Sequence, residues 1–156
     1  MLSQLARLST EADGRYASAE ELQFLKDYFQ SFNHRMSAYK KIQAAEKDII
    51  QQVEAQMQSI DPSLFRRGSQ DVTAKCRADA ARVLRHSTAA LLINDTERLR
   101  DRLLLWLQTI LSPFHTKNSS TITYDVMKKV LKQYLTAEEV SLFFPILEIN
   151  STLLGK

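Results

Sequence analysis

Cysteine, glycine and proline are all scarce in this chain of 156 residues, which contains one cysteine, three glycines and three prolines. The single cysteine, Cys76, excludes an internal disulfide framework, so we expect a reduced, intracellular protein. The glycines stand at positions 14, 68 and 155, too far apart to form a phosphate-binding loop. Because glycine and proline interrupt regular structure, their scarcity predicts that most of the chain is helical.

Long apolar runs and blocks of one charge are also missing. The longest apolar run, residues 103–107, is far shorter than the ~20 residues that a membrane-spanning helix needs. The N-terminus has no apolar signal segment, so we expect a cytoplasmic protein without a membrane span. Basic and acidic residues alternate along the chain at a net charge of +3, a pattern that does not favour a nucleic-acid partner. The length fits one domain over residues 1–156.

The first half of the sequence predicts a short helix over residues 2–8 and then one long apolar stripe. Ser18 and Glu21 form a capping box, whose hydroxyl and carboxylate can satisfy backbone amides at a helix start. The stripe behind it repeats every three to four residues and ends where Asp61 and Pro62 break the helix. Its members are Leu22, Leu25, Phe29, Phe32, Met36, Ile42, Ala45, Ile49, Val53 and Met57.

The second half predicts a loop around residues 66–69 and then further helices. One helix carries Cys76, and the Asn94–Thr96 cap opens another that reaches Leu111 and stops at Ser112–Pro113. We expect a polar loop over 114–120, a helix over 122–134 and a last helix behind a capping box over 136–139, with a kink or a late start at Pro145. Together, the two halves predict an all-α protein of seven or eight helices without strands.

Cys76 lies in a charged stretch, with Lys75 and Arg77 beside it and Asp79 three residues later. Because an i, i+3 pair lies on one flank of a helix, Cys76 and Asp79 can reach one ligand together. Basic neighbours stabilise a thiolate, so we predict a lowered pKa for Cys76. The same residues also fit an ordinary helix in which Cys76 is a small core residue and Lys75 pairs with Asp79.

The residues after Cys76 continue a recognisable pattern. Leu84, Arg85 and Thr88 are followed by Asn94-Asp95 and by Asp101-Arg102. This stretch resembles the chromophore-bearing helix of the phycobiliproteins, the bilin-carrying light-harvesting subunits of cyanobacteria. Their pattern is roughly Cys-x-Arg-Asp, then Leu-Arg-Tyr-x-Thr-Tyr-Ala, then Gly-Asp and Asp-Arg. Residues 12–22 are similar to a second family motif, Asp-x-x-Ala-Arg-Tyr-x-Ser-x-x-Glu-Leu.

The resemblance implies a globin-like phycobiliprotein fold with an added N-terminal helical pair. It also implies pairing with a second copy of the chain, or with another phycobiliprotein-like subunit, within phycobilisomes at the thylakoid. In the family an N-terminal aspartate meets an arginine of the neighbouring subunit, and Asp13 and Arg85 occupy those positions. Tyr16, Leu2 and Leu5 are expected at the same interface.

The resemblance further implies a phycocyanobilin-type linear tetrapyrrole as cofactor. Cys76 would attach the pigment, Asp79 would accept hydrogen bonds from its pyrrole N–H groups, and basic side chains would pair with its propionates. The candidates for this last role are Lys75, Arg77 and Arg82, and His86 completes the expected cofactor-binding residues.

Departures from the family pattern mark a divergent member. The family's arginine before the aspartate is Ala78 here, its two tyrosines are His86 and Ala89, and the loop before the cysteine is shorter. The glycine of the following helix is Trp106, expected in the core or in a pocket wall.

Two alternatives stay open from the sequence. One is an interaction module that kept the fold and lost the pigment, with Trp106 filling the pocket. The other is a haem-binding sensor with His86 as ligand, although the helix after Asp95 carries no histidine. No spacing of His34, His86 and His115 fits a metal site, and no catalytic arrangement is present, so we do not expect an enzyme.

Overall fold

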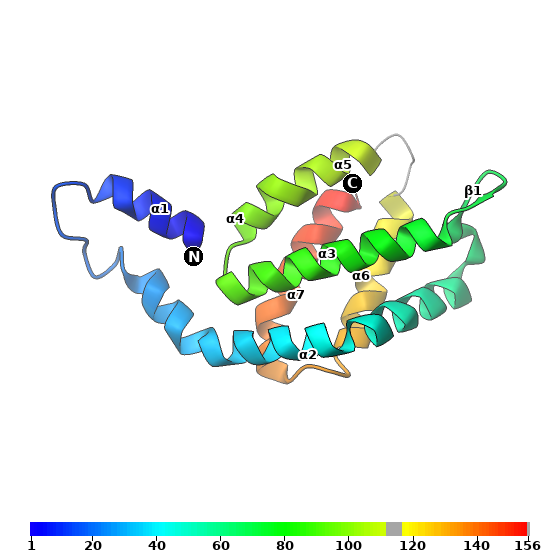
Figure 1. The fold of residues 1–156 in the computed structure, drawn as a ribbon, viewed down its shortest axis with the longest axis horizontal. Coiled ribbons are helices and arrows are strands. Elements are labelled where there is room, and N and C mark those ends of the chain that lie inside the picture. The colour runs from blue at the N-terminus through cyan, green and yellow to red at the C-terminus, as the bar shows by residue number, and fades with distance from the viewer. Residues whose placement is uncertain (112–116, 156) are drawn as a thin grey trace.

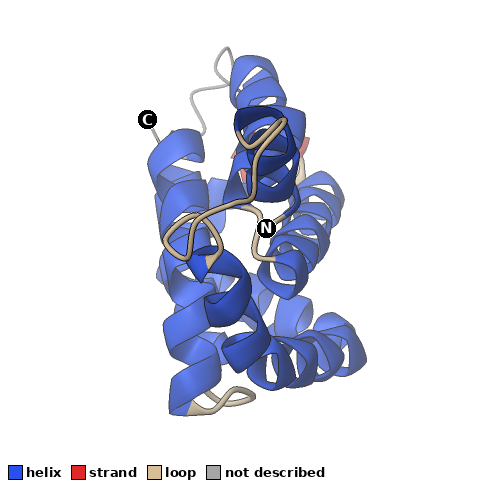
Figure 2. Cartoon of the chain, turned by 90° about the vertical axis from the view of Figure 1, so that its left-hand side faces the viewer, coloured by secondary structure: helices blue, strands red, loops and turns tan. Residues whose placement is uncertain are grey.

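The computed structural model describes residues 1–111 and 117–155, which form helices joined by short loops around one shared hydrophobic core (Figures 1 and 2). The all-α prediction is confirmed. In chain order, the elements are α1 (Leu2–Glu11), α2 (Gln23–Ile60), the 3-10 turn η1 (Pro62–Phe65), β1 (Arg66–Arg67), β2 (Gln70–Asp71), α3 (Thr73–Ile93), α4 (Thr96–Leu99), the π-helical turn η2 (Arg100–Leu104), α5 (Leu105–Leu111), α6 (Lys117–Leu131) and α7 (Ala137–Leu154).

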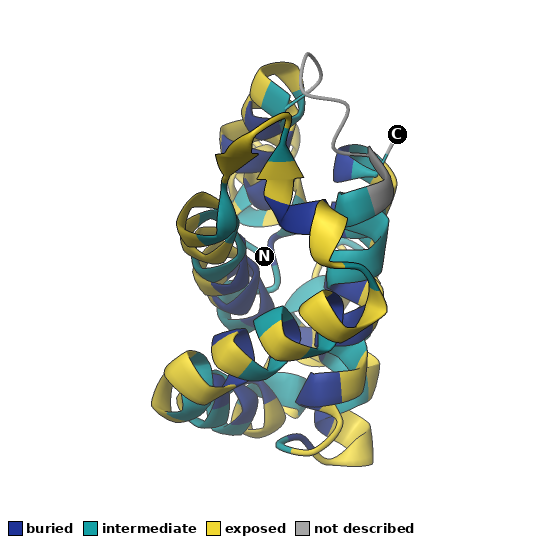
Figure 3. Cartoon of the chain, turned by 90° about the vertical axis from the view of Figure 1, so that its right-hand side faces the viewer, coloured by how far each residue is buried: buried dark blue, intermediate teal, exposed yellow. Residues whose placement is uncertain are grey.

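The second half of α2 packs along α3, with α6 and α7 on the far side of this pair (Figure 1). The apolar stripe explains this part of the fold, because Ile42, Ile49, Val53 and Met57 are all buried in the core. Along the helices that face the viewer in Figure 3, buried positions turn inward and exposed positions turn to the outside. No helix in the described ranges is both long and apolar enough to cross a bilayer.

The first half of α2 differs from the prediction. Phe29 of the expected stripe is 70% exposed and Leu22 is 41% exposed, whereas Tyr28, Arg35 and Ala38 are buried on a neighbouring face. In Figure 1 this part of α2 extends beyond the body together with α1. The apolar pattern continues through this half of α2, but no element in residues 1–111 or 117–155 covers Leu22 and Phe29.

The loop expected around residues 66–69 is a small β-hairpin. β1 pairs antiparallel with β2, Arg66 opposite Asp71 and Arg67 opposite Gln70. Gly68 has φ +60° at the first of the two turn residues, where a type II′ hairpin turn needs glycine. The prediction of no strands is therefore wrong at this one place, because two residue pairs are too short to produce an alternating pattern.

The turn between α3 and α4 follows the predicted cap. Asn94 ends α3 in the left-handed region at φ +49°, and the Asp95 side chain accepts a hydrogen bond from the Arg98 amide. Asp95 also accepts bonds from the amide and the hydroxyl of Ser3, at 2.7 and 2.8 Å, and this holds α1 against the start of α4.

The region after Leu111 needs one correction. Ser112–Pro113 and residues 114–116 lie outside the described residues, but residues 117–120 belong to α6 instead of the expected loop. The helix ends at Leu131, before the predicted Tyr134. Asparagine and serine are weak helix formers, so residues 117–120 give little local signal for this early start.

α7 begins at the predicted capping box, in which Thr136 and Glu139 exchange hydrogen bonds with each other's backbone amides. The helix does not start late at Pro145, which lies inside its continuous span. Glu139 is only 2% exposed and also accepts two hydrogen bonds from Nζ of Lys41, at 2.8 and 2.9 Å, which ties α7 to α2.

This ion pair predicts a pH-dependent stability. Burial alone would raise the pKa of Glu139, but hydrogen bonds from Lys41, Ser37 and the Thr136 amide hold it below its usual value. A carboxyl whose pKa is lowered by folding stabilises the fold above its unfolded pKa, and this stability is lost as the pH falls through the folded pKa. We expect Glu139→Gln to lower the free energy of unfolding by about 1–2 kcal/mol at neutral pH, and by less in acid.

Urea unfolding at several pH values measures this effect. Glu138→Gln is the matched control, since Glu138 lies next in the chain but is exposed. Equal losses in both variants at neutral pH would contradict the role given to the buried carboxylate.

Candidate functional site

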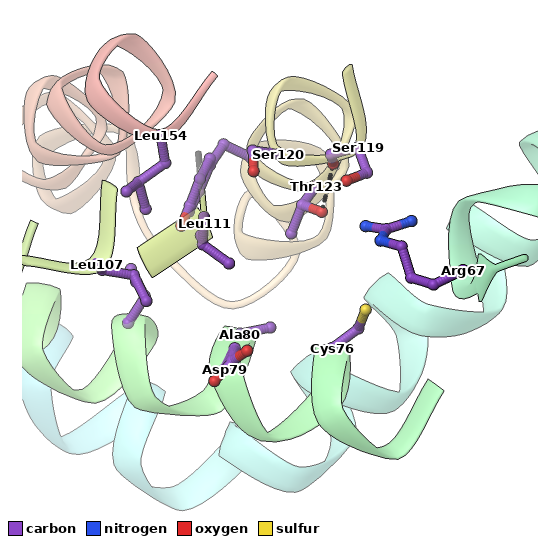
Figure 4. A pocket seen from close by; sticks show the side chains of 12 residues that line it. Arg67, Cys76, Asp79, Ala80, Leu107, Leu111, Ser119, Ser120, Thr123 and Leu154 are labelled. Atoms are coloured by element: carbon purple, nitrogen blue, oxygen red, sulfur yellow. Dashed lines mark hydrogen bonds between the residues drawn. The ribbon is translucent and has the colours of Figure 1, made fainter. Parts of the chain in front are cut away.

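A pocket opens where the first half of α3 faces α5 and α6, and the thiol of Cys76 lies on its wall (Figure 4). The pocket has a volume of about 80 Å³. Its lining residues come from the hairpin, α3, α5, α6 and the end of α7: Arg67, Cys76, Asp79, Ala80, Val83, Leu107, Leu111, Ser119, Ser120, Thr123, Tyr124 and Leu154. The site thus combines an apolar floor with one thiol, one carboxylate and one guanidinium group.

The Cys76 sulfur points into this pocket and is half-buried. Burial raises the pKa of the thiol, and the positive charge of Arg67 is the largest effect that opposes the rise. Asp79 raises the pKa further, whereas Lys75 lowers it. The prediction of a lowered pKa is therefore wrong, because desolvation outweighs the nearby positive charges.

Asp79 lies one turn after Cys76 and lines the same pocket. Its carboxylate is 3.9 Å from Nη1 of Arg82, a weak surface ion pair within the helix. The phenol of Tyr124 is buried beside them, and burial, together with the charge of Asp79, raises its pKa far above the usual value. A carboxylate from α3 and a phenolic hydroxyl from α6 therefore line the same pocket.

The structure separates Arg77 from the pocket. Its guanidinium group donates two hydrogen bonds to Glu54 of α2, at 2.6 and 2.8 Å. Arg77 and Lys75 are direct neighbours of Cys76 in the sequence, but neither lines the pocket, since adjacent positions point about 100° apart around a helix.

Arg67 is the site residue that sequence reasoning missed. It reaches the pocket from the hairpin, and Figure 4 shows its guanidinium group on the same side of the pocket as the Cys76 sulfur. Nothing in its spacing to Cys76 identifies it, because only the folded hairpin brings β1 back over the start of α3.

His86 lies in a different cavity of about 240 Å³, shared with Asp95, Arg98 and Arg102. It stands ten residues after Cys76, or ~15 Å along the helix. The structure therefore does not bring His86 to the Cys76 pocket. Its cavity is also smaller than the ~300–1,000 Å³ typical of cofactor sites.

Trp106 is 53% exposed and is absent from the lining of the Cys76 pocket. The expectation that it lies in the core or blocks the pocket is wrong. Leu105 and Ile110, at 43% and 41%, are exposed on the same short helix. No group of three or more His, Cys, Asp or Glu side chains that could hold a metal ion occurs in the described residues.

The predicted interface residues stand on the outside of this single chain. Tyr16 is 99% exposed, Leu2 is 42% exposed, Asp13 is exposed and Leu5 is partly exposed. Arg85 is exposed as well, but its guanidinium group donates two hydrogen bonds to Glu46 of α2, at 2.6 and 2.7 Å. A contact between Asp13 and the Arg85 of a neighbouring subunit stays a prediction, and it would compete with Glu46.

The helical order, the exposed N-terminal pair and the pocket beside α3 define the class as the globin-like phycobiliprotein fold. A model of the phycobilisome protein family matches residues 8–152, and the chain belongs to this family. It is 29% identical to a phycobiliprotein beta chain of Mastigocladus laminosus over 129 residues. These residues cover 80% of this chain and 76% of that protein.

Two further relatives are allophycocyanin beta-18 subunits. That of Cyanidium caldarium is 27% identical over 125 residues, or 77% of this chain and 74% of its own length. The subunit of Picosynechococcus is 24% identical over 136 residues, which cover 84% of this chain and 80% of that subunit. These low identities confirm a divergent member.

The raised pKa of Cys76 makes a direct prediction. Alkylation of this only thiol by a neutral maleimide should follow an apparent pKa above the ~8.5 of an ordinary cysteine, so at neutral pH it should be slower than for an exposed thiol. The rate is measured against pH, with the urea-unfolded chain as the control. An apparent pKa below that of the unfolded chain would show a charge-activated thiol instead.

Proposed function

We propose that this chain is a non-enzymatic, phycobiliprotein-like subunit that holds a linear tetrapyrrole through a thioether at Cys76. One observation carries the proposal: in a member of the phycobilisome protein family, the only thiol faces a pocket that a carboxylate also lines. Its role is light harvesting, pigment handling or regulation of the antenna. It would act in the cytoplasm at phycobilisomes beside the thylakoid.

The residues of the pocket fit the chemistry of such a pigment. The Cys76 thiol adds across an exocyclic carbon–carbon double bond, so that a sulfur–carbon bond forms and the thiol proton ends on the neighbouring carbon. Asp79 accepts hydrogen bonds from pyrrole N–H groups, which favours their protonated form. When bound and held extended, the conjugated pigment supplies red absorption and fluorescence.

The pocket volume limits how the pigment is held. At about 80 Å³ the cavity is well below the ~300–1,000 Å³ of sites that enclose a drug-sized ligand. The pocket therefore takes the end of the pigment that is attached to sulfur. The remainder lies over the outer surface of the neighbouring helices, where a partner subunit can cover it.

Co-expression with a bilin tests the attachment. We expect a band that fluoresces under zinc on a denaturing gel, and its loss in Cys76→Ala. Asp79→Asn should keep the covalent band but reduce the red absorption of the native protein, because the pyrrole nitrogens lose their charged acceptor.

Asp125→Asn is the matched control for charge, since Asp125 is an exposed helical aspartate outside the pocket. A colourless wild-type band would reject covalent attachment. If no bilin changed the absorbance spectrum of the wild type either, the pigment-free interaction module would be the better function, and the small cavity is the observation that favours it.

The proposed pairing of subunits has its own test. If Asp13 of one subunit binds Arg85 of another, then Asp13→Arg and Arg85→Asp should each weaken self-association, and the double variant should recover part of it. Glu46→Gln, which releases Arg85 from its contact within the chain, should strengthen self-association. Analytical ultracentrifugation measures these shifts.

The outcomes separate the possible partners. A wild-type chain that stays monomeric at all concentrations would contradict self-pairing and favour a different phycobiliprotein-like subunit. Weaker association in Glu46→Gln would contradict the competition for Arg85.

A further inference from the structure

Arg67 is a cation in the pocket without an acidic partner. Its Nη1 donates to the backbone oxygen of Arg66, at 3.0 Å, and in the described part of the chain no carboxylate forms an ion pair with it. Its charge nevertheless acts on Cys76 more strongly than that of any other basic residue. Figure 4 shows its guanidinium group and the Cys76 sulfur on the same side of the pocket.

The basic residues on α3 itself are already engaged. Arg77 is held by two hydrogen bonds to Glu54, and Arg82 lies beside Asp79. Ala78 supplies no charge at all. If a ligand at Cys76 carries a carboxylate, the guanidinium group best placed to meet it therefore comes from the hairpin.

We propose that Arg67 forms a carboxylate-binding subsite for the ligand attached at Cys76, and this proposal rests on the proposed function. The planar guanidinium fork binds a carboxylate with two parallel hydrogen bonds. The hairpin gives the subsite a fixed position, because the turn at Gly68 and the pairing of Arg67 with Gln70 orient β1. The ligand class is an electrophile with a carboxylate a few ångströms from its reactive carbon, such as a propionate-bearing pigment.

A test without pigment uses the single thiol as its own reporter. Cys76 reacts by disulfide exchange with dithionitrobenzoate, which carries carboxylates, and with neutral dithiodipyridine. In each case the thiolate attacks the disulfide, a mixed disulfide forms and one thiolate of the reagent leaves. We expect the ratio of the two rates, anionic over neutral, to fall about fivefold in Arg67→Gln.

The ratio cancels any change in the thiol pKa, since that change slows both reagents alike. Arg66→Gln is the matched control, as Arg66 is the neighbouring strand residue and lies outside the pocket, and it should leave the ratio near that of the wild type. Arg67→Lys should keep part of the preference. An unchanged ratio in Arg67→Gln, or an equal fall in Arg66→Gln, would overturn the proposal.

Pigment binding then distinguishes the two proposals. Arg67→Gln should weaken binding of a free-acid bilin by about fivefold and leave binding of its dimethyl ester unchanged. If the wild type binds neither form, the proposed function fails, while the reagent ratio still decides whether Arg67 binds carboxylates. If both forms weaken equally in Arg67→Gln, the pigment is bound but Arg67 is not its carboxylate partner.

Discussion

The antiparallel packing of α2 on α3 is the constraint on which the site depends. Glu46 and Glu54 are eight residues apart on α2, and their partners Arg85 and Arg77 are eight residues apart on α3, in the reverse order. Both pairs therefore belong to one register of the two helices. Exposed ion pairs stabilise a fold only slightly, so burial of the apolar stripe supplies most of the stability of the α2–α3 packing. The two ion pairs favour this register of the helices over registers shifted along the helix axis.

This register determines which face of α3 remains for a ligand. With Arg77 and Arg85 turned to the edge of α2, the positions that carry Cys76, Asp79 and Ala80 face α5 and α6. The hairpin then brings Arg67 over the first turn of the same helix.

The sequence predicted what local patterns encode, namely the all-α class, the capping box that opens α7, the break at Asp61 and the buried half of α2. Ser18 and Glu21 also exchange the two expected hydrogen bonds, but they do not cap α2, which begins only at Gln23. Sequence reasoning failed where the contact that decides the structure joins residues distant in the chain. Phe29 continues the apolar stripe, but the described elements leave it 70% exposed. Arg77 was assigned to the pocket because Glu54, 23 residues away, gives no local signal. Arg67 was missed for the same reason.

At Cys76, two requirements of a covalent ligand site conflict, namely shielding from water and a reactive thiolate. Under the proposed function, a pocket that shields a pigment end from water also desolvates the thiol, and this desolvation raises the pKa of Cys76. Arg67 partly opposes this rise, but a ligand carboxylate that binds Arg67 neutralises the opposing charge just when the thiolate is needed. Under the proposed function, unassisted attachment is therefore slow, and a base supplied from outside the chain would accelerate it.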